Sequence, residues 1–147
     1  MDVRNNIEIL LIEDNLAETR LIIEVFNEDG NTSNIFGVRD GLEAMDYLHK
    51  KGKYKECKKP SLIILDLNLP KKNGMEVLKE IKTNNKLRHI PIIVMASSRE
   101  DTDILKSYEN YASAYIIKSI NFDEFKKHMR VFKDYWFNCV ALPKKEY

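Results

Sequence analysis

The sequence predicts an α/β fold in which five parallel strands form one doubly wound sheet and a helix follows each strand. Five short apolar runs rich in β-branched residues recur along the chain, at residues 7–12, 34–38, 62–65, 92–95 and 114–117. The stretches between them have helical spacing, and each opens on a residue suited to an N-cap with an acid three positions later. Alternating strands and helices favour a parallel sheet that is covered on both faces.

The individual elements follow in order from these signals. The second strand is the weakest, whereas the third is the continuous run Leu-Ile-Ile-Leu, which predicts a central strand buried on both faces. Right-handed crossovers favour the strand order 2-1-3-4-5 of the flavodoxin-like arrangement. The predicted helix starts are the pairs Asn15/Glu18, Asp40/Glu43, Asn73/Glu76, Ser98/Asp101 and Asn121/Glu124. The apolar faces that follow include Val77, Leu78 and Ile81 in the third helix and Phe125, Met129, Phe132 and Trp136 in the fifth.

Length and composition predict a single cytoplasmic domain over residues 1–147. The 24 basic residues nearly balance the 23 acidic ones, which gives no indication of nucleic-acid binding. Cys57 and Cys139 have no metal-binding spacing and are too few for a disulfide scaffold. The sequence shows neither a secretory signal nor a segment of membrane-spanning length. The lysine-rich stretch 49–60 is interpreted as a solvated loop in preference to a docking site for an acidic partner.

Three acidic residues are predicted to meet at the carboxyl edge of the sheet. Glu13 and Asp14 follow the first strand and Asp66 follows the third, and these strands are neighbours in the predicted order. Such a cluster repels itself unless a cation binds in it. Ligands that are all oxygen favour magnesium over zinc. Local capping is the alternative role for Asp14 and Asn15.

Lys118 follows the fifth strand and reaches the same edge. A lysine in this position often extends to solvent. Beside three acids it can instead neutralise a bound anion. A metal ion, a lysine and an exposed carboxylate together indicate nucleophilic chemistry, in which Asp66 attacks phosphorus and forms an aspartyl phosphate.

This pattern resembles the receiver domain of two-component response regulators, and the resemblance runs from residue 7 to about residue 135. It implies a receiver core at about 7–135 and a C-terminal interaction tail at about 136–147. It implies that Asp66 is the phosphoacceptor and that Lys118 pairs with the phosphoryl group. It also implies that Mg²⁺ or Mn²⁺ is bound by Glu13, Asp14, Asp66 and the backbone carbonyl of Asn68. Tyr115 would be the family's switch aromatic, for which a half-buried strand tyrosine is the alternative interpretation.

Two positions depart from the family pattern. Ala96 stands where the family places Thr or Ser, so we expect phosphorylation to bias the active state less strongly. Ser97 or Ser98 is the candidate replacement contact to the phosphoryl group if it turns inward. Against this, adjacent strand positions face opposite ways, and either serine is also a candidate cap of the fourth helix. Lys118-Ser119 replaces the usual Lys-Pro, and we expect a trans bond because cis costs about 2.5–4 kcal/mol without proline.

Three features resemble one subgroup, the small single-domain regulators that partner phytochrome-type and related histidine kinases. They are the Lys118-Ser119 pair, the lysine-rich stretch 49–60 and the tail from Tyr135 to Pro143. This resemblance implies a sensor histidine kinase or histidine phosphotransfer protein as partner, signalling by docking, and a homodimer through the fourth helix, fifth strand, fifth helix and tail. The fourth helix, the fifth helix and the tail carry more apolar residues than one sheet can bury, which supports such an interface. The candidate interface residues are Ile104, Tyr108, Phe132, Tyr135, Trp136 and Phe137. In the alternative interpretation the tail folds back over its own domain.

Parts of the sequence are also compatible with two other functions. Phosphatases of the haloacid-dehalogenase type also form an aspartyl phosphate, but their general acid would fall at Asn68, which cannot serve that role. We therefore expect no enzymatic activity beyond slow self-dephosphorylation. The second alternative is a receiver-like module that docks without phosphorylation, which the missing hydroxyl at Ala96 favours.

Overall fold

The computed structural model describes residues 7–30 and 34–144. Its one sheet contains β1 (Glu8–Ile12), β2 (Asn34–Val38), β3 (Leu62–Leu65), β4 (Ile92–Ala96) and β5 (Ala114–Ile117). All paired strands are parallel and lie in the order β2-β1-β3-β4-β5, which confirms the predicted topology. Ile12 is in register with both Val38 and Leu65, so the carboxyl ends of the first three strands are level.

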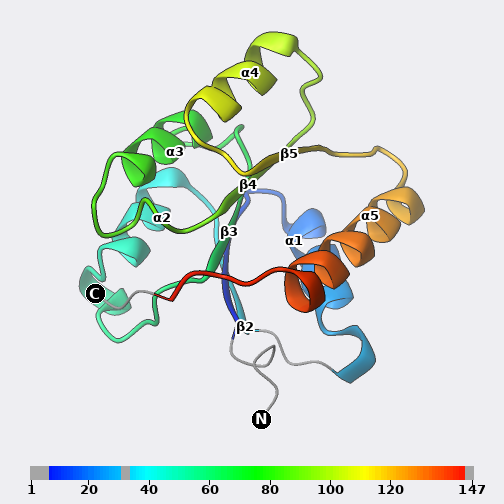
Figure 1. Cartoon of the computed structure of the whole chain (residues 1–147), viewed down its shortest axis with the longest axis horizontal. Helices are drawn as coiled ribbons and strands as arrows, with labels where there is room; N and C mark the ends of the chain where they lie inside the picture. The colour runs from blue at the N-terminus through cyan, green and yellow to red at the C-terminus, as the bar shows by residue number, and fades with distance from the viewer. Residues whose placement is uncertain (1–6, 31–33, 145–147) are drawn as a thin grey trace.

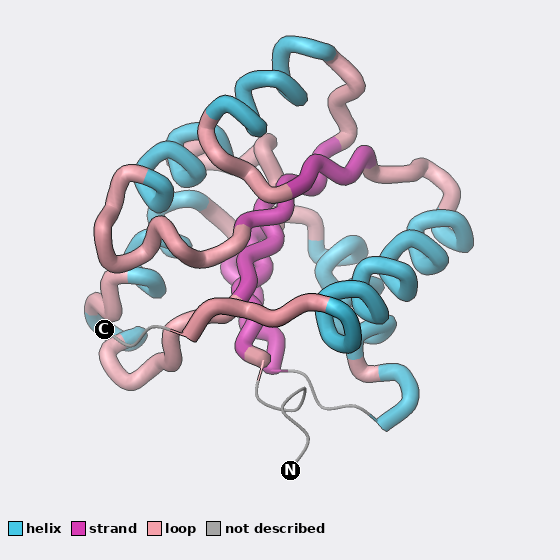
Figure 2. The backbone as a smooth tube through the Cα atoms, viewed as in Figure 1, coloured by secondary structure: helices cyan, strands magenta, loops and turns pink. Residues whose placement is uncertain are grey.

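Helices cover both faces of the sheet (Figure 1). One face carries α1 (Leu16–Phe26) and α5 (Phe122–Asp134), and the other carries α2 (Gly41–Leu48), α3 (Gly74–Lys82) and α4 (Asp101–Glu109). Figure 2 shows the strands running between these two helical layers. No helix in the described part of the chain is long and apolar enough to cross a membrane.

Four of the five predicted helix caps are confirmed. Asn15, Asp40, Asn73 and Asn121 each accept a hydrogen bond from the backbone N–H three residues on. The fourth prediction is wrong, because α4 begins after Glu100 and has no side-chain cap. The Ser98 hydroxyl instead accepts the Glu100 N–H and donates to the Asp103 carboxylate.

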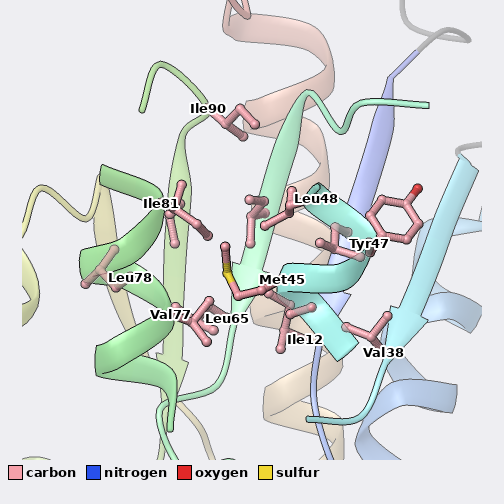
Figure 3. Close-up of a cluster of buried hydrophobic side chains, with 14 of the residues drawn as sticks. Ile12, Val38, Met45, Tyr47, Leu48, Leu65, Val77, Leu78, Ile81 and Ile90 are labelled. Atoms are coloured by element: carbon pink, nitrogen blue, oxygen red, sulfur yellow. The ribbon is translucent and has the colours of Figure 1, made fainter. Parts of the chain in front are cut away.

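The core consists of one apolar cluster on each face of the sheet. Leu10 and Ile12 belong to the cluster under α2 and α3, whereas Ile9 and Leu11 belong to the cluster under α1 and α5. Successive residues of a strand point to opposite faces, so burial of both sets explains why these strands are apolar throughout. Figure 3 shows the first cluster, where the side chain of Met45 from α2 lies among side chains of the sheet and α3.

The chain after α5 folds against its own domain over a π-helical turn, η4 (Tyr135–Cys139). Phe132 and Phe137 are buried and both pack on Phe26, with ring centroids 5.8 Å and 5.6 Å away. The expectation that these two phenylalanines remain available for an interface is therefore wrong, because α1 supplies an apolar surface that buries them. Trp136 is half-buried, and Tyr135 is exposed. Residues 145–147 of the predicted tail lie outside the described residues.

The lysine-rich stretch is a loop with one short 3₁₀ turn, η3 (Gly52–Tyr54). Tyr54 anchors it by packing edge-on against Phe36 and beside Tyr47. Lys51, Lys53, Lys55 and Lys58 are exposed, as a solvated loop requires.

Candidate functional site

A cavity of about 620 Å³ opens at the carboxyl edge of the sheet. It brings together residues that follow β1, β3, β4 and β5, as the predicted topology requires. The lining residues are Glu13, Asp14, Asn15, Glu18, Asp66, Leu67, Asn68, Met75, Ala96, Ser97, Ser98, Asp103 and Lys118.

Asp66 lies at the centre of this edge because β3 is a central strand. Its backbone N–H donates to the Ile12 carbonyl at 3.0 Å, and its Oδ1 accepts the N–H of Asn68 at 3.2 Å. The start of α3 approaches this turn closely, since the Gly74 N–H donates to the Leu67 carbonyl at 2.9 Å. A Cβ at Gly74 would lie 2.3 Å from the Asp66 carbonyl oxygen, so only glycine permits this packing.

Glu13 and Asp14 occupy different environments. The Glu13 side chain is almost fully buried, and its Oε2 accepts the Asn15 N–H at 3.1 Å. Asp14 is exposed, with Oδ1 4.0 Å from the Arg39 guanidinium. Within residues 7–30 and 34–144, no three His, Cys, Asp or Glu side chains are already arranged around one metal position. The all-oxygen donor set and the open cavity nevertheless fit a hard divalent cation that retains water ligands.

The side chain of Lys118 points into the cavity and is only 8% exposed, so the alternative in which it extends to solvent is wrong. Its Nζ lies 2.7 Å from Glu13 Oε1, 2.6 Å from Glu18 Oε2 and 3.4 Å from Asp66 Oδ2. Its backbone N–H donates to the Ala96 carbonyl, which holds the end of β5 level with β4. The lysine therefore bridges the acids from β1, α1 and β3.

Burial and mutual contact perturb these groups strongly. Burial raises the pKa of Glu13 to about 8, and the adjacent Glu18 adds to this increase against the opposing effect of Lys118. Burial would also raise the pKa of Glu18, but its contacts with Glu13 and Lys118 outweigh burial and lower it. For Lys118, burial favours the neutral amine, yet the close contacts with Glu13 and Glu18 raise the pKa. The Lys118 side chain is therefore kept as the charged ammonium by the three acidic side chains around it.

Sequence reasoning assigned Glu18 only to a helix cap and missed its place in the cavity. The available signal was its position in the first turn of a helix that starts at the functional edge. Asp103 was also missed as a lining residue, because α4 was expected to start differently.

The switch positions lie on the β4 and β5 side of the cavity. Ala96 is buried and adds only a methyl group to the lining. Ser97 lines the cavity with its side chain exposed, whereas Ser98 is held by its 2.6 Å hydrogen bond to Asp103. Tyr115 is half-buried, and its hydroxyl donates to the Ser98 carbonyl at 2.9 Å. The peptide bond between Lys118 and Ser119 is trans, as expected.

Comparison with known proteins decides the family. Residues 9–130 match the family model described as response regulator receiver domain. The chain belongs to the response regulator receiver family. This receiver is 42% identical to response regulator Rcp1 of Synechocystis sp. over 92% of each chain. It is 41% identical to the probable methanogenesis regulatory protein FilR2 of Methanothrix harundinacea, over 92% of this chain and 86% of FilR2.

Two solved structures show the same arrangement. The phosphorylated cyanobacterial phytochrome response regulator RcpA superimposes with a TM-score of 0.90 at 41% identity, over 93% of this receiver and 98% of RcpA. The Mn²⁺-bound form of Rcp1 also gives a TM-score of 0.90 at 41% identity, over 93% and 99% of the two chains.

Membership of the receiver family defines the general role of the chain. Receivers are components of two-component systems, in which the partner is a histidine kinase, and they are in general signalling proteins rather than enzymes. The homology to Rcp1 and RcpA is consistent with signalling by phosphorylation.

Proposed function

We propose that this receiver accepts a phosphoryl group on Asp66 from a sensor histidine kinase and signals by docking to other proteins. The observation that carries the proposal is the placement of the Lys118 ammonium 3.4 Å from the Asp66 carboxylate, inside an acidic cavity. A buried lysine beside a nucleophilic carboxylate can stabilise the charge on a transferring phosphoryl group.

Asp66, Asn68 and Lys118 have separate roles in the transfer of the phosphoryl group. A carboxylate oxygen of Asp66 attacks phosphorus, the O–P bond forms as the P–N bond to histidine breaks, and the electron pair stays on the ring nitrogen. The Asn68 N–H orients the Asp66 carboxylate through Oδ1. Lys118 then pairs with the phosphoryl oxygens. Slow self-dephosphorylation is the most catalysis that this site should support.

A divalent cation, which we propose is Mg²⁺, would be held by Glu13, Asp14, Asp66 and the backbone carbonyl of Asn68. When bound, it would neutralise charge on the phosphoryl oxygens. The Mn²⁺-bound structure of Rcp1 supports the binding of a divalent ion. Glu13 must turn from Lys118 towards the cation, because its Oε1 now lies 2.7 Å from the ammonium.

Ser97 is the proposed replacement for the missing hydroxyl at Ala96. It lines the cavity, whereas Ser98 already bonds Asp103 and the Glu100 N–H. Contact between Ser97 and the phosphoryl group would pull on the β4–α4 loop, to which the Tyr115 hydroxyl is bonded through the Ser98 carbonyl.

The proposed partner is a phytochrome-like or related sensor kinase, or a histidine phosphotransfer protein. RcpA, a cyanobacterial phytochrome response regulator, supports the phytochrome-like kinase. The 41% identity to FilR2, close to the 42% identity to Rcp1, extends the candidates beyond light sensors. A homodimer through α4, β5 and α5 is supported by exposed apolar side chains on these elements or directly after them. These are Leu105, Tyr108, Tyr111, Val131 and Tyr135, with Ile104 and Trp136 half-buried beside them.

The second candidate is a module that docks without phosphorylation, which the buried methyl group of Ala96 favours. Intact-protein mass after incubation with acetyl phosphate and Mg²⁺ separates the two. We expect a single phosphoryl adduct on the wild type that requires Mg²⁺ and is absent from Asp66→Asn. Asp46→Asn, an exposed carboxylate on α2, is the matched control and should still be phosphorylated. No adduct and no Mg²⁺ binding in the wild type would favour the docking module.

A further inference from the structure

Glu18 shares a sequence signature with the other helix caps but uses its carboxylate differently. In α2 the corresponding Glu43 accepts the Arg39 N–H at 3.1 Å, and in α3 Glu76 accepts from the side chain of the cap residue at 2.6 Å. In α1 the cap's backbone N–H, that of Asn15, is taken by Glu13 at 3.1 Å. The Glu18 carboxylate is therefore not needed at the helix start and is available to the cavity.

The Glu18 carboxylate instead contacts Lys118. Its Oε2 lies 2.6 Å from Nζ, as close as the Glu13 contact at 2.7 Å, and its side chain is only 25% exposed. Screening by water is limited for charges in such a setting, so this contact has a substantial effect on where the ammonium lies. Asp66 is the most distant of the three acids, with Oδ2 3.4 Å from Nζ.

A divalent cation at this edge makes conflicting demands on Glu13. The same side chain that would bind the cation now contacts Lys118, with Oε1 2.7 Å from Nζ. Without another partner, the buried ammonium would either retain Glu13 or stand uncompensated near a second positive charge, and both weaken cation binding. Glu18 is a further carboxylate within reach of Lys118 that is not among the proposed metal ligands.

We infer that Glu18 is a positioning residue that holds Lys118 so that Glu13 is released to the divalent cation. This inference rests on the proposed function, because it requires the cation site. Neutralising Glu18 leaves Lys118 on Glu13 and also makes the cavity less negative. Both effects act in the same direction, towards weaker Mg²⁺ binding.

The test is the Kd for Mg²⁺ measured by isothermal titration calorimetry on the full chain. Glu18→Gln should weaken binding by about tenfold, because Lys118 stays on Glu13 and the cavity also loses a unit of negative charge. Glu24→Gln is the matched control, because Glu24 lies on the same helix, is 69% exposed and is about 9 Å further along the helix axis. The control should change the Kd by less than about twofold, since its charge is screened.

A double-mutant cycle separates positioning of Lys118 from simple attraction through space. In a Lys118→Met background, Glu18→Gln should weaken binding by only about twofold to threefold, because only the screened attraction remains. Equal ratios in the two backgrounds would overturn the inference, as would an unchanged Kd for Glu18→Gln. The Tm of each metal-free variant shows whether it is folded, and Glu18→Gln should fold because its N–H still bonds Asn15.

The outcomes distinguish this inference from the proposed function. A wild type that binds no Mg²⁺ would overturn the cation site and the inference with it. A wild type that binds Mg²⁺ and forms the Asp66 adduct, with Glu18→Gln binding equally well, would overturn the inference alone.

Discussion

At the scale of single residues, the proposed phosphorylation site pairs a carboxylate with a buried lysine but has no hydroxyl at position 96. Asp66 and Lys118 lie 3.4 Å apart, whereas Ala96 presents a methyl group to the same cavity. A hydrogen bond to a charged group contributes about 1.5–3 kcal/mol, so its absence should leave the phosphorylated protein less biased towards its active state.

Ala96→Thr should strengthen the response to phosphorylation. The added hydroxyl would point to the cavity and could bond a phosphoryl oxygen, which should shift the conformational equilibrium by about tenfold or more. The measurement is the phosphorylation-induced change in the backbone amide NMR signals of Ser98 and Tyr115. Ala96→Val is the control, because valine has the shape of threonine without its hydroxyl. The same response in the Thr and Val variants would contradict the prediction.

At the scale of elements, α5 stabilises α1 through a buried lysine. Lys133 is buried, and its Nζ donates to the carbonyls of Val25 at 3.2 Å and Glu28 at 3.0 Å, near the C-terminal end of α1. Arg130 adds a two-pronged ion pair to the Glu28 carboxylate, with both N···O distances 3.0 Å. The last carbonyls of a helix lack hydrogen-bond donors within the helix, so Lys133 of α5 supplies donors to the end of α1.

Lys133→Met should lower the free energy of unfolding by about 1–3 kcal/mol, because it leaves buried carbonyls without a donor. Urea denaturation of the metal-free protein measures the change. Lys127→Met, an exposed lysine of the same helix, should leave the denaturation midpoint nearly unaltered. If the two variants had equal midpoints, the hydrogen bonds of Lys133 would contribute nothing to stability.

At the scale of the whole molecule, the segment after α5 buries one aromatic side chain in the core and leaves another exposed. Phe137 is 7% exposed and lies against Phe26, while Tyr135, two residues earlier, is 55% exposed. The α1 and α5 layer in Figure 1 therefore includes the start of the tail. Exposed apolar side chains on α4 and α5 remain for contact with another molecule.

Phe137→Ala should mainly affect the stability of the fold, whereas Tyr135→Ala should mainly affect association between molecules. Phe137→Ala should lower the free energy of unfolding by about 3–5 kcal/mol, because it opens a cavity in the core. Tyr135→Ala should change stability by less than about 0.5 kcal/mol, but it should shift the phosphorylated protein towards monomer. Urea denaturation and sedimentation velocity measure the two effects. A wild type that is monomeric at high concentration, with and without phosphorylation, would remove the proposed homodimer.

The sequence by itself determined the strand order, four helix caps and the edge of the sheet where Glu13, Asp14, Asp66 and Lys118 gather. These features depend on local patterns: apolar runs define strands, cap residues define helix starts, and a parallel topology brings the strand ends together. Only the tertiary structure decided that Glu18 contacts Lys118, that Ser98 bonds Asp103 and that Phe137 enters the core. Each of these side chains had more than one partner within reach. Which partner each side chain contacts depends on burial and charge contributed by elements distant in sequence. A local sequence pattern does not contain that information.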